Sequence, residues 1–253
     1  MILEKFNLSG KVAIVTGASK GLGQRMALAL ADAGADIVGV SSGSMSETKE
    51  KVEGIGRRFL ELRANLLSIE PIQEIIDKTV ENFGKIDILI NNAGIIRRAD
   101  AIEFTEKDWD DVMNINLKTL FFFSQAVAKQ YIKQGTGGKI INIASMLSFQ
   151  GGIRVPSYTA SKSGVMGITR LLANEWAKYN INVNAIAPGY MVTDNTAPLR
   201  ADEERNKAIL DRIPAGRWGL PEDLEGPVVF LASDASNYVN GYTIAVDGGW
   251  LAR

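Results

Sequence analysis

Short apolar runs rich in β-branched residues alternate along the whole chain with longer stretches of helical periodicity. The apolar runs predict strands at Val12–Val15, Asp36–Val40, Phe59–Arg63, Ile86–Ile90, Lys139–Ile143, Asn182–Ala187 and Thr243–Val246. Several of these runs are apolar almost without alternation, which is typical of strands that helices cover on both faces. Strands that alternate with helices indicate parallel strands joined by helical crossovers.

The stretches between the strands predict helices at Gly21–Gly34, Met45–Gly56, Pro71–Phe83, Glu106–Gln134, Ser157–Tyr179 and Pro221–Ser233. Pro71 and Pro221 stand in a first helical turn, where proline is tolerated. The pattern predicts an α/β fold with one doubly wound, seven-stranded parallel sheet and helices on both faces. We expect a single domain over residues 1–253, because no repeat or linker interrupts the pattern.

Residues 188–214 form the least regular segment of the chain. A proline stands at each end, and a charged helical piece, Asp202–Asp211, lies between them. A long irregular insertion after a strand end is often an active-site lid, although a plain surface loop is the alternative. We expect a substrate lid at 188–214.

The chain has no cysteine and no histidine. A thiolate nucleophile, a Ser-His-Asp triad and a Cys/His zinc site are therefore excluded. No carboxylate spacing suggests a metal site, so no metal is expected. Acid and base chemistry must come from Tyr, Lys, Asp or Glu.

The charges are nearly balanced, with 28 basic and 29 acidic residues. A nucleic-acid binder normally shows a basic excess, so no nucleic-acid partner is expected. The sequence has no apolar run of about 18 residues and no charged-then-apolar signal segment. We therefore expect no membrane association and a cytoplasmic location.

A glycine-rich turn, Thr16–Gly23, joins the first predicted strand to an Ala/Leu-rich helix. Glycines at such a junction let backbone amides approach a phosphate at a helix N-terminus. The spacing Gly-x-x-x-Gly-x-Gly is neither the Gly-x-Gly-x-x-Gly fingerprint nor a P-loop. In its strand-turn-helix setting, the turn indicates nucleotide binding.

The end of the second strand normally carries the residue that reads the adenosine ribose. An acidic residue there favours NAD, and a basic residue favours NADP. Ser41 and Ser42 occupy this place, so neither signature is present. Lys20, in the glycine turn, either meets a 2′-phosphate or is a solvated lysine. These residues leave the choice between NAD and NADP open.

Tyr158 and Lys162 stand four residues apart in a predicted helix and therefore share one face. A tyrosine that works at neutral pH needs its pKa lowered by roughly 3 units, about 4 kcal/mol of phenolate stabilisation. A nearby cation can supply much of this. Such pairs also occur on ordinary solvated helices, so the other motifs must decide.

With both motifs in view, the chain resembles the short-chain dehydrogenase/reductase family over essentially its whole length. Thr16–Gly23 matches the family's glycine turn, and Asn91-Asn92-Ala93-Gly94 matches its Asn-Asn-Ala-Gly stretch. Asn116 and Ser145 match the remaining catalytic residues, and residues 188–193 look like the Pro-Gly segment that holds the nicotinamide. The resemblance implies a Rossmann-like fold and hydride transfer between a nicotinamide and a secondary alcohol or its ketone.

The resemblance implies a separate role for each of four catalytic residues. Tyr158 exchanges the hydroxyl proton, and Ser145 hydrogen-bonds the substrate oxygen. Lys162 lowers the pKa of the tyrosine and holds the nicotinamide ribose, while Asn116 anchors a water that leads to Lys162. Each residue alone has an ordinary structural alternative, but their order and spacing together favour catalysis.

The resemblance also implies a cofactor-binding set. Its members are Gly17, Ser19, Lys20, Gly21, Leu22, Gly23, Ser41, Ser42, Asn65, Leu66, Asn92, Ala93, Gly94, Tyr158, Lys162, Pro188, Gly189, Met191 and Thr193. Asn65 departs from the family, where an aspartate often contacts the adenine. Asparagine still donates and accepts hydrogen bonds, so it stays in the set.

The loop between Ser145 and Tyr158 is expected to line the substrate pocket. The expected substrate residues are Ser145, Gln150, Arg154, Tyr158 and Tyr190. An arginine pairs with a carboxylate bidentately, so Gln150 and Arg154 suit a carboxylated substrate. Arg97 and Arg98 either border the same mouth or are surface charges. We favour the second interpretation for Arg98 and leave it open for Arg97 and Arg154.

At finer grain, residues 95–98, 106–114, 138–190 and 240–253 resemble the sugar-acid branch of the family. This implies a keto-deoxy sugar acid as substrate and, usually, NAD as cofactor. The nearest alternative is a 3-oxoacyl-carrier-protein reductase, which would need a basic docking surface. A non-catalytic dinucleotide sensor is the alternative from a different class.

The predicted helices Glu106–Gln134 and Ser157–Tyr179 carry more apolar side chains than one sheet face needs. They include the run Leu120–Phe123 and Trp176. Excess apolar surface usually marks a partner interface. The resemblance implies a homotetramer, and burial of these aromatic residues in the monomer core is the alternative.

Overall fold

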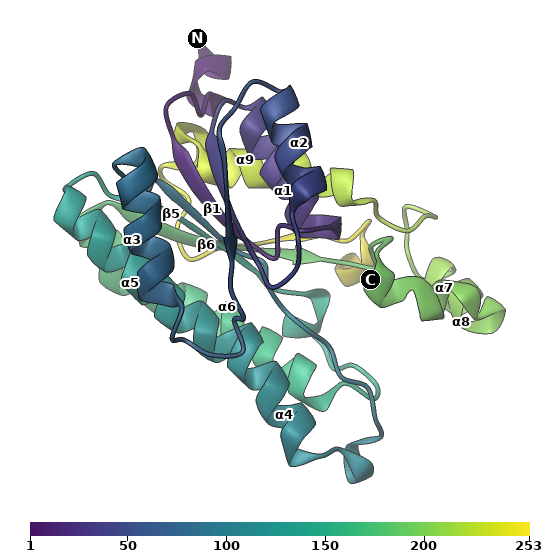
Figure 1. The fold of residues 1–253 in the computed structure, drawn as a ribbon. Coiled ribbons are helices and arrows are strands. Elements are labelled where there is room, and N and C mark those ends of the chain that lie inside the picture. The colour runs from purple at the N-terminus through teal and green to yellow at the C-terminus, as the bar shows by residue number, and fades with distance from the viewer.

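The computed structural model describes residues 1–253 and contains one parallel sheet covered by helices on both faces (Figure 1). The strand order is β3-β2-β1-β4-β5-β6-β7. The strands are β1 (Val12–Thr16), β2 (Asp36–Ser41), β3 (Phe59–Arg63), β4 (Ile88–Asn91), β5 (Gly138–Ile143), β6 (Ile181–Pro188) and β7 (Thr243–Val246). All neighbouring strands pair in parallel, which confirms the predicted fold class.

Nine α-helices accompany the strands. They are α1 (Gly21–Asp32), α2 (Ser46–Gly54), α3 (Ile72–Phe83), α4 (Glu106–Met113), α5 (Thr119–Gln134), α6 (Pro156–Trp176), α7 (Ala197–Ala201), α8 (Glu203–Leu210) and α9 (Glu225–Ala232). Helices α1, α2 and α9 bury their apolar residues in a core on one face of the sheet. Helices α3, α5 and α6 do the same on the other face. None of these helices combines the length and apolarity that crossing a bilayer requires.

Successive residues of the central strands enter opposite cores. On β1, Val15 packs in the core of α1, α2 and α9, whereas Ile14 packs in the core of α3, α5 and α6. Every residue of β1 is buried. The strands therefore carry apolar side chains at consecutive positions, as a sheet covered on both faces requires.

The predicted continuous helix Glu106–Gln134 was wrong in its middle. A π-helical turn, Asn114–Lys118, separates α4 from α5. Inside it, the Asn116 side chain accepts a hydrogen bond from the Ile95 N–H (2.9 Å) and donates one to the Ile95 carbonyl (3.0 Å). A π-turn holds one extra residue and often marks a functional position. The tie to Ile95 accounts for the break, which no apolar periodicity encodes.

Two other predicted boundaries also change. Ile86 and Asp87 precede β4, and the Asp87 carboxylate accepts a hydrogen bond from the N–H of Val12 (2.9 Å). The helix predicted at Pro221–Ser233 begins as a 3₁₀ turn, Pro221–Leu224, before α9. The remaining boundaries agree closely with the sequence pattern.

Gly23→Ala is expected to lower the free energy of unfolding by about 1–3 kcal/mol through overpacking. A Cβ at this position of α1 would lie 2.1 Å from the Gly17 carbonyl oxygen and 2.5 Å from Asn92 Nδ2. Chemical denaturation measures the change. The matched control is Gly167→Ala on α6, where a Cβ meets nothing within 4 Å. This control should raise the free energy of unfolding by about 1 kcal/mol. A Gly23→Ala variant as stable as the wild type would contradict the close packing at Gly23.

Candidate active site

The carboxyl ends of β1 and β4 are joined by side-chain hydrogen bonds. Thr16 Oγ1 accepts from the backbone N–H groups of Asn92 and Ala93, both at 2.9 Å. In return, Asn92 Nδ2 donates to the Thr16 carbonyl oxygen at 2.9 Å. The strand order changes direction between these two strands. In open α/β sheets, ligands bind in the crevice at such a switch point.

The glycine turn lies over this junction and leads into α1. Gly17 adopts a left-handed φ of +68°, and Gly21 one of +58°. A Cβ on Gly17 would come within 2.7 Å of Asn92 Nδ2, whereas one on Gly21 would meet open space. The turn therefore packs tightly against β4 on one side and exposes backbone on the other. This arrangement fits a dinucleotide phosphate bound at the N-terminus of α1.

A cavity of about 450 Å³ opens over the turn, and most of the predicted cofactor set lines it. Those residues are Gly17, Ser19, Lys20, Gly21, Leu22, Gly23, Asn92, Ala93, Gly94, Tyr158, Lys162 and Thr193. Lys20 forms an ion pair with Asp194 across this cavity (2.6 Å). The glycine turn and the segment after β6 are therefore in direct contact.

The other predicted cofactor residues, Ser41, Ser42, Asn65, Leu66, Pro188, Gly189 and Met191, do not line this cavity. Ser41 ends β2, and Asn65 accepts a hydrogen bond from the Leu67 N–H (3.1 Å). Leu66 and Met191 are core residues on opposite sheet faces. Any cofactor contact from these two would have to come from the backbone.

Lys162 is buried on α6, and its Nζ donates to the Ile143 carbonyl oxygen at the end of β5 (2.6 Å). The same Nζ lies 5.6 Å from the centroid of the Tyr158 ring. Burial lowers the pKa of Lys162 to about 8. The predicted pairing of phenol and ammonium on one helix face is therefore present.

The pKa of Tyr158 departs from the expectation, because it is raised above its ordinary value. Burial is the largest cause, and the Ser145 hydroxyl and the charge of Arg98 oppose it. The expected lowering by Lys162 is not seen in this structure, so that part of the prediction was wrong. A tyrosine with a raised pKa is protonated at neutral pH, which is the form that can donate a proton to a carbonyl oxygen.

Ser145 and Asn116 are each held near this pair by hydrogen bonds. Ser145 caps the short turn Met146–Ser148 after β5, and its Oγ accepts from the Leu147 N–H (3.2 Å). Ser148 Oγ donates to the Lys162 carbonyl oxygen (2.6 Å) and so fixes this turn against α6. Asn116 Nδ2 also lies 3.3 Å from Ser161 Oγ, beside Lys162 in the chain.

A second cavity of about 570 Å³ adjoins the first, and Tyr158 lines both. All five predicted substrate residues line this second cavity, namely Ser145, Gln150, Arg154, Tyr158 and Tyr190. The phenol therefore stands where the two cavities meet. A proton-exchanging group needs this position if cofactor and substrate occupy the two sides.

The segment after β6 supplies one wall of the second cavity. It contains α7 and α8, which project beyond the end of the sheet (Figure 1), and Leu199, Arg205 and Arg212 line the cavity from it. Tyr190 packs edge-on against Trp250, with ring centroids 4.9 Å apart. The Arg212 guanidinium lies 4.1 Å above the Trp250 ring.

Sequence reasoning missed Arg205, Arg212 and Trp250 as cavity residues, because no local motif marks them. Their only signal is that two of them stand in the predicted lid. It also misjudged Arg98, which lines the cavity and donates to the Asn195 carbonyl oxygen (3.0 Å). The preferred interpretation of Arg98 as a plain surface charge is therefore corrected.

Arg97 and Arg154, for which the sequence left a substrate role open, differ in position. Arg97 pairs with Asp108 (3.3 Å) and Asp111 (3.7 Å) on α4 and does not line the cavity. Arg154 lines the cavity and pairs with Asp100 (3.0 Å). Only Arg154 is placed to face a substrate.

Residues 17–251 match a family described as enoyl-(acyl carrier protein) reductase. The chain belongs to the short-chain dehydrogenase/reductase family and is an NAD(P)-dependent oxidoreductase. It is 73% identical over 253 residues to the 2-dehydro-3-deoxy-D-gluconate 5-dehydrogenase of Dickeya dadantii, covering 100% of both chains. A 3-oxoacyl-[acyl-carrier-protein] reductase from Thermotoga maritima is 40% identical, covering 96% of this chain and 98% of that protein.

A solved structure with bound NADP is also similar. It is an Agrobacterium tumefaciens protein provisionally assigned as a 2-deoxy-D-gluconate 3-dehydrogenase. The two chains are 55% identical with a TM-score of 0.93, over 98% of this chain and 99% of that one.

Tyr158→Phe is expected to lower turnover at least about 100-fold, because the variant keeps the ring but loses the exchangeable proton. The dissociation constant of NADH should change little. Nicotinamide absorbance measures turnover, and a fluorescence titration measures binding. Tyr179→Phe, beyond the end of α6 and outside both cavities, is the matched control. A Tyr158→Phe variant with a near-normal rate would rule out the assigned role.

Proposed function

We propose that the chain is a sugar-acid dehydrogenase that acts on 2-dehydro-3-deoxy-D-gluconate at its 5-position. The observation that carries the proposal is the charge of the second cavity. Four arginines line it, Arg98, Arg154, Arg205 and Arg212, against one acidic residue, Asp202. A cavity with this balance favours a small anionic substrate, and guanidinium groups bind carboxylates bidentately.

The arginines of the lid are the best placed to bind a substrate carboxylate. Arg154 is already paired with Asp100 (3.0 Å). Arg212 instead donates to the amide oxygen of Gln150 (3.2 Å) and stacks on Trp250. Arg205 and Arg212 have no acidic partner of their own, so a carboxylate would complete their hydrogen bonding.

The chemistry follows from which residues the two cavities share. A bound nicotinamide cofactor supplies or accepts the hydride. In the direction of reduction, the protonated Tyr158 donates its proton to the carbonyl oxygen, and the Ser145 hydroxyl donates a hydrogen bond to the same oxygen. Lys162 would hold the nicotinamide ribose, and Asn116, fixed by Ile95, would anchor a water that leads protons to Lys162. The reverse sequence oxidises the alcohol.

We propose that residues 1–253 form one catalytic domain with a substrate lid at 188–214. Two contacts, one across the cofactor cavity and one from a residue of the substrate cavity, support the lid. Lys20 pairs with Asp194, and Arg98 donates to the Asn195 carbonyl oxygen. The lid thus touches both the glycine turn and the substrate cavity, and closing it would exclude water from the reacting groups.

The alternative as a 3-oxoacyl-carrier-protein reductase is less well supported. That relative is 40% identical, against 73% for the sugar-acid enzyme. A non-catalytic sensor is less well supported, because Ser145, Tyr158 and Lys162 line two adjoining cavities. Asn116 bonds to Ser161 on the helix that carries Tyr158 and Lys162.

We propose a homotetramer in the cytoplasm. Leu120 and Phe123 are buried in the monomer, so these two residues belong to the monomer core and not to a subunit interface. Ile132 on α5, Leu171 on α6, and Tyr238 and Tyr242 near the C-terminus remain exposed and would be covered by other subunits. The cytoplasm holds the recycled pool of dinucleotide that such an enzyme uses. Light scattering should give four times the chain mass, and a monomer at working concentration would contradict the assembly.

Nicotinamide absorbance is expected to change with keto-deoxy sugar acids and not with neutral sugars or acyl thioesters. The assay is run with NAD and NADP separately. The double variant Arg205→Gln/Arg212→Gln should raise the KM for the sugar acid at least about tenfold, because two carboxylate partners are lost. Lys207→Gln, on α8 outside the cavity, is the control. Activity confined to acyl thioesters would overturn the proposal.

A further inference from the structure

Strand β2 ends without a charged residue that could recognise the adenosine ribose. The next strand supplies one. In the parallel pairing of β2 and β3, Ser41 lies directly beside Arg63, the last residue of β3. Because the strands are parallel, both residues stand at the carboxyl edge of the sheet, where nucleotides bind in Rossmann-type folds.

Arg63 and Ser41 also share the face of the sheet that carries α1. Residues two apart on a strand point to the same face. Ile37 on β2 and Phe59 on β3 belong to the core under α1 and α2, and Ser41 and Arg63 each follow at an even spacing. The glycine turn feeds into α1 on this face, so Arg63 and the turn lie on the same side of the sheet.

The outer nitrogens of Arg63 are available to a ligand. Its Nε donates to Glu61 Oε1 (2.8 Å), and that carboxylate oxygen also accepts from the Met45 N–H (3.4 Å). The hydrogen bond from Arg63 helps to keep the pKa of Glu61 below its usual value, so Glu61 stays charged and holds the guanidinium by its inner edge. The Arg63 side chain is 63% exposed.

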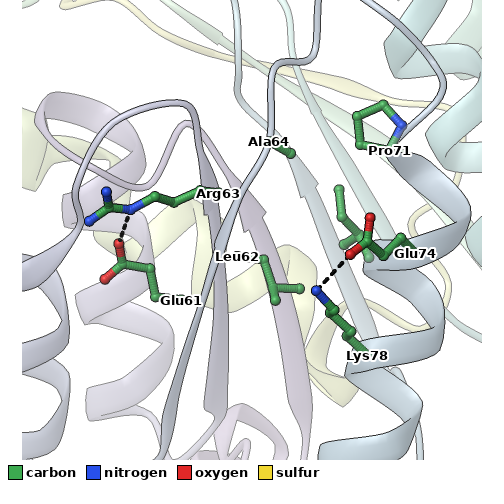
Figure 2. A pocket seen from close by; sticks show the side chains of 8 residues that line it. Glu61, Leu62, Arg63, Ala64, Pro71, Glu74 and Lys78 are labelled. Carbon is green, nitrogen blue, oxygen red and sulfur yellow. Dashed lines mark hydrogen bonds and ion pairs between the residues drawn. The ribbon is translucent and has the colours of Figure 1, made fainter.

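Figure 2 shows this arrangement beside a cavity of about 490 Å³. Arg63 and Glu61 lie on one side of β3, and the Glu74–Lys78 ion pair of α3 lies on the other side. Leu62 points towards α3, between the two pairs. The cavity therefore has two basic groups, but only Arg63 lies on the face of the glycine turn.

We propose that Arg63 determines how this chain accepts NADP, by binding the 2′-phosphate of the adenosine ribose. Its two terminal nitrogens form a fork that suits a phosphate, and Ser41 lies beside it in the strand pairing. Without a phosphate, Glu61 holds the same guanidinium, so NAD is accepted as well. The inference rests on the NAD(P) chemistry of the family and is independent of the sugar-acid substrate.

Lys20 is the rival group for the phosphate. It lies in the glycine turn, but its Nζ is paired with Asp194 at 2.6 Å. A phosphate would have to displace that carboxylate. Arg63, by contrast, meets a phosphate without losing its bond to Glu61.

Arg63→Gln is expected to raise the dissociation constant of NADPH about tenfold to a hundredfold, because hydrogen bonds to a charged phosphate are lost. The dissociation constant of NADH should stay unchanged, which also shows that the variant is folded. Fluorescence titration of the purified protein measures both constants. Competition by 2′,5′-ADP and by 5′-AMP separates the contact with the 2′-phosphate from contacts with the rest of the cofactor. In the variant, only the binding of 2′,5′-ADP should weaken.

Two further variants sharpen the test. Glu61→Gln removes a negative charge beside the proposed phosphate position and should tighten the binding of NADPH without affecting that of NADH. Lys78→Gln, the control from the opposite side of β3, should change neither constant. Equal weakening of NADPH and NADH by Arg63→Gln would overturn the proposal. The proposal would also be overturned if Lys20→Gln abolished the discrimination between NADPH and NADH and Arg63→Gln left it intact.

Discussion

The hydrogen-bonded junction between Thr16 and Asn92 is the constraint on which the two cavities depend. It joins the ends of β1 and β4, two strands that are adjacent in the sheet but distant in the chain. The junction leaves so little space that Gly17 and Gly23 cannot carry a side chain beside it. The glycine turn is thereby pressed against β4, and its open side becomes the floor of the cofactor cavity.

The proposed catalytic residues are fixed in the same way, by hydrogen bonds from side chains to backbone. Lys162 donates to the end of β5, Ser148 donates to α6, and Asn116 bonds both backbone groups of Ile95. Each bond satisfies a buried polar group that would otherwise cost about 1–3 kcal/mol. The site is therefore positioned by groups that the fold must pair anyway.

Much of the fold could be predicted from the sequence because the strands are buried on both faces and read as apolar runs. Tyr158 and Lys162 were found from their spacing of four residues on one predicted helix, and Ser145 was found from the resemblance to the family. The π-turn at Asn116 was not predictable, since its cause is a bond to Ile95 in another segment. The raised pKa of Tyr158 was missed for a similar reason: burial depends on the packed structure. Arg205 and Arg212 reach the cavity only through the position of the segment after β6.

The division of labour between α6 and the segment after β6 has an evolutionary consequence. Tyr158 and Lys162 stand on a long helix packed against the sheet, whereas Arg205 and Arg212 belong to a peripheral segment. If the proposed roles hold, substitutions in that segment change which molecules are accepted without altering Tyr158 or Lys162. A fold organised in this way can diversify by exchanging one wall while its reactive centre is inherited unchanged, and the surface after β6 is where descendants of one ancestor would differ first.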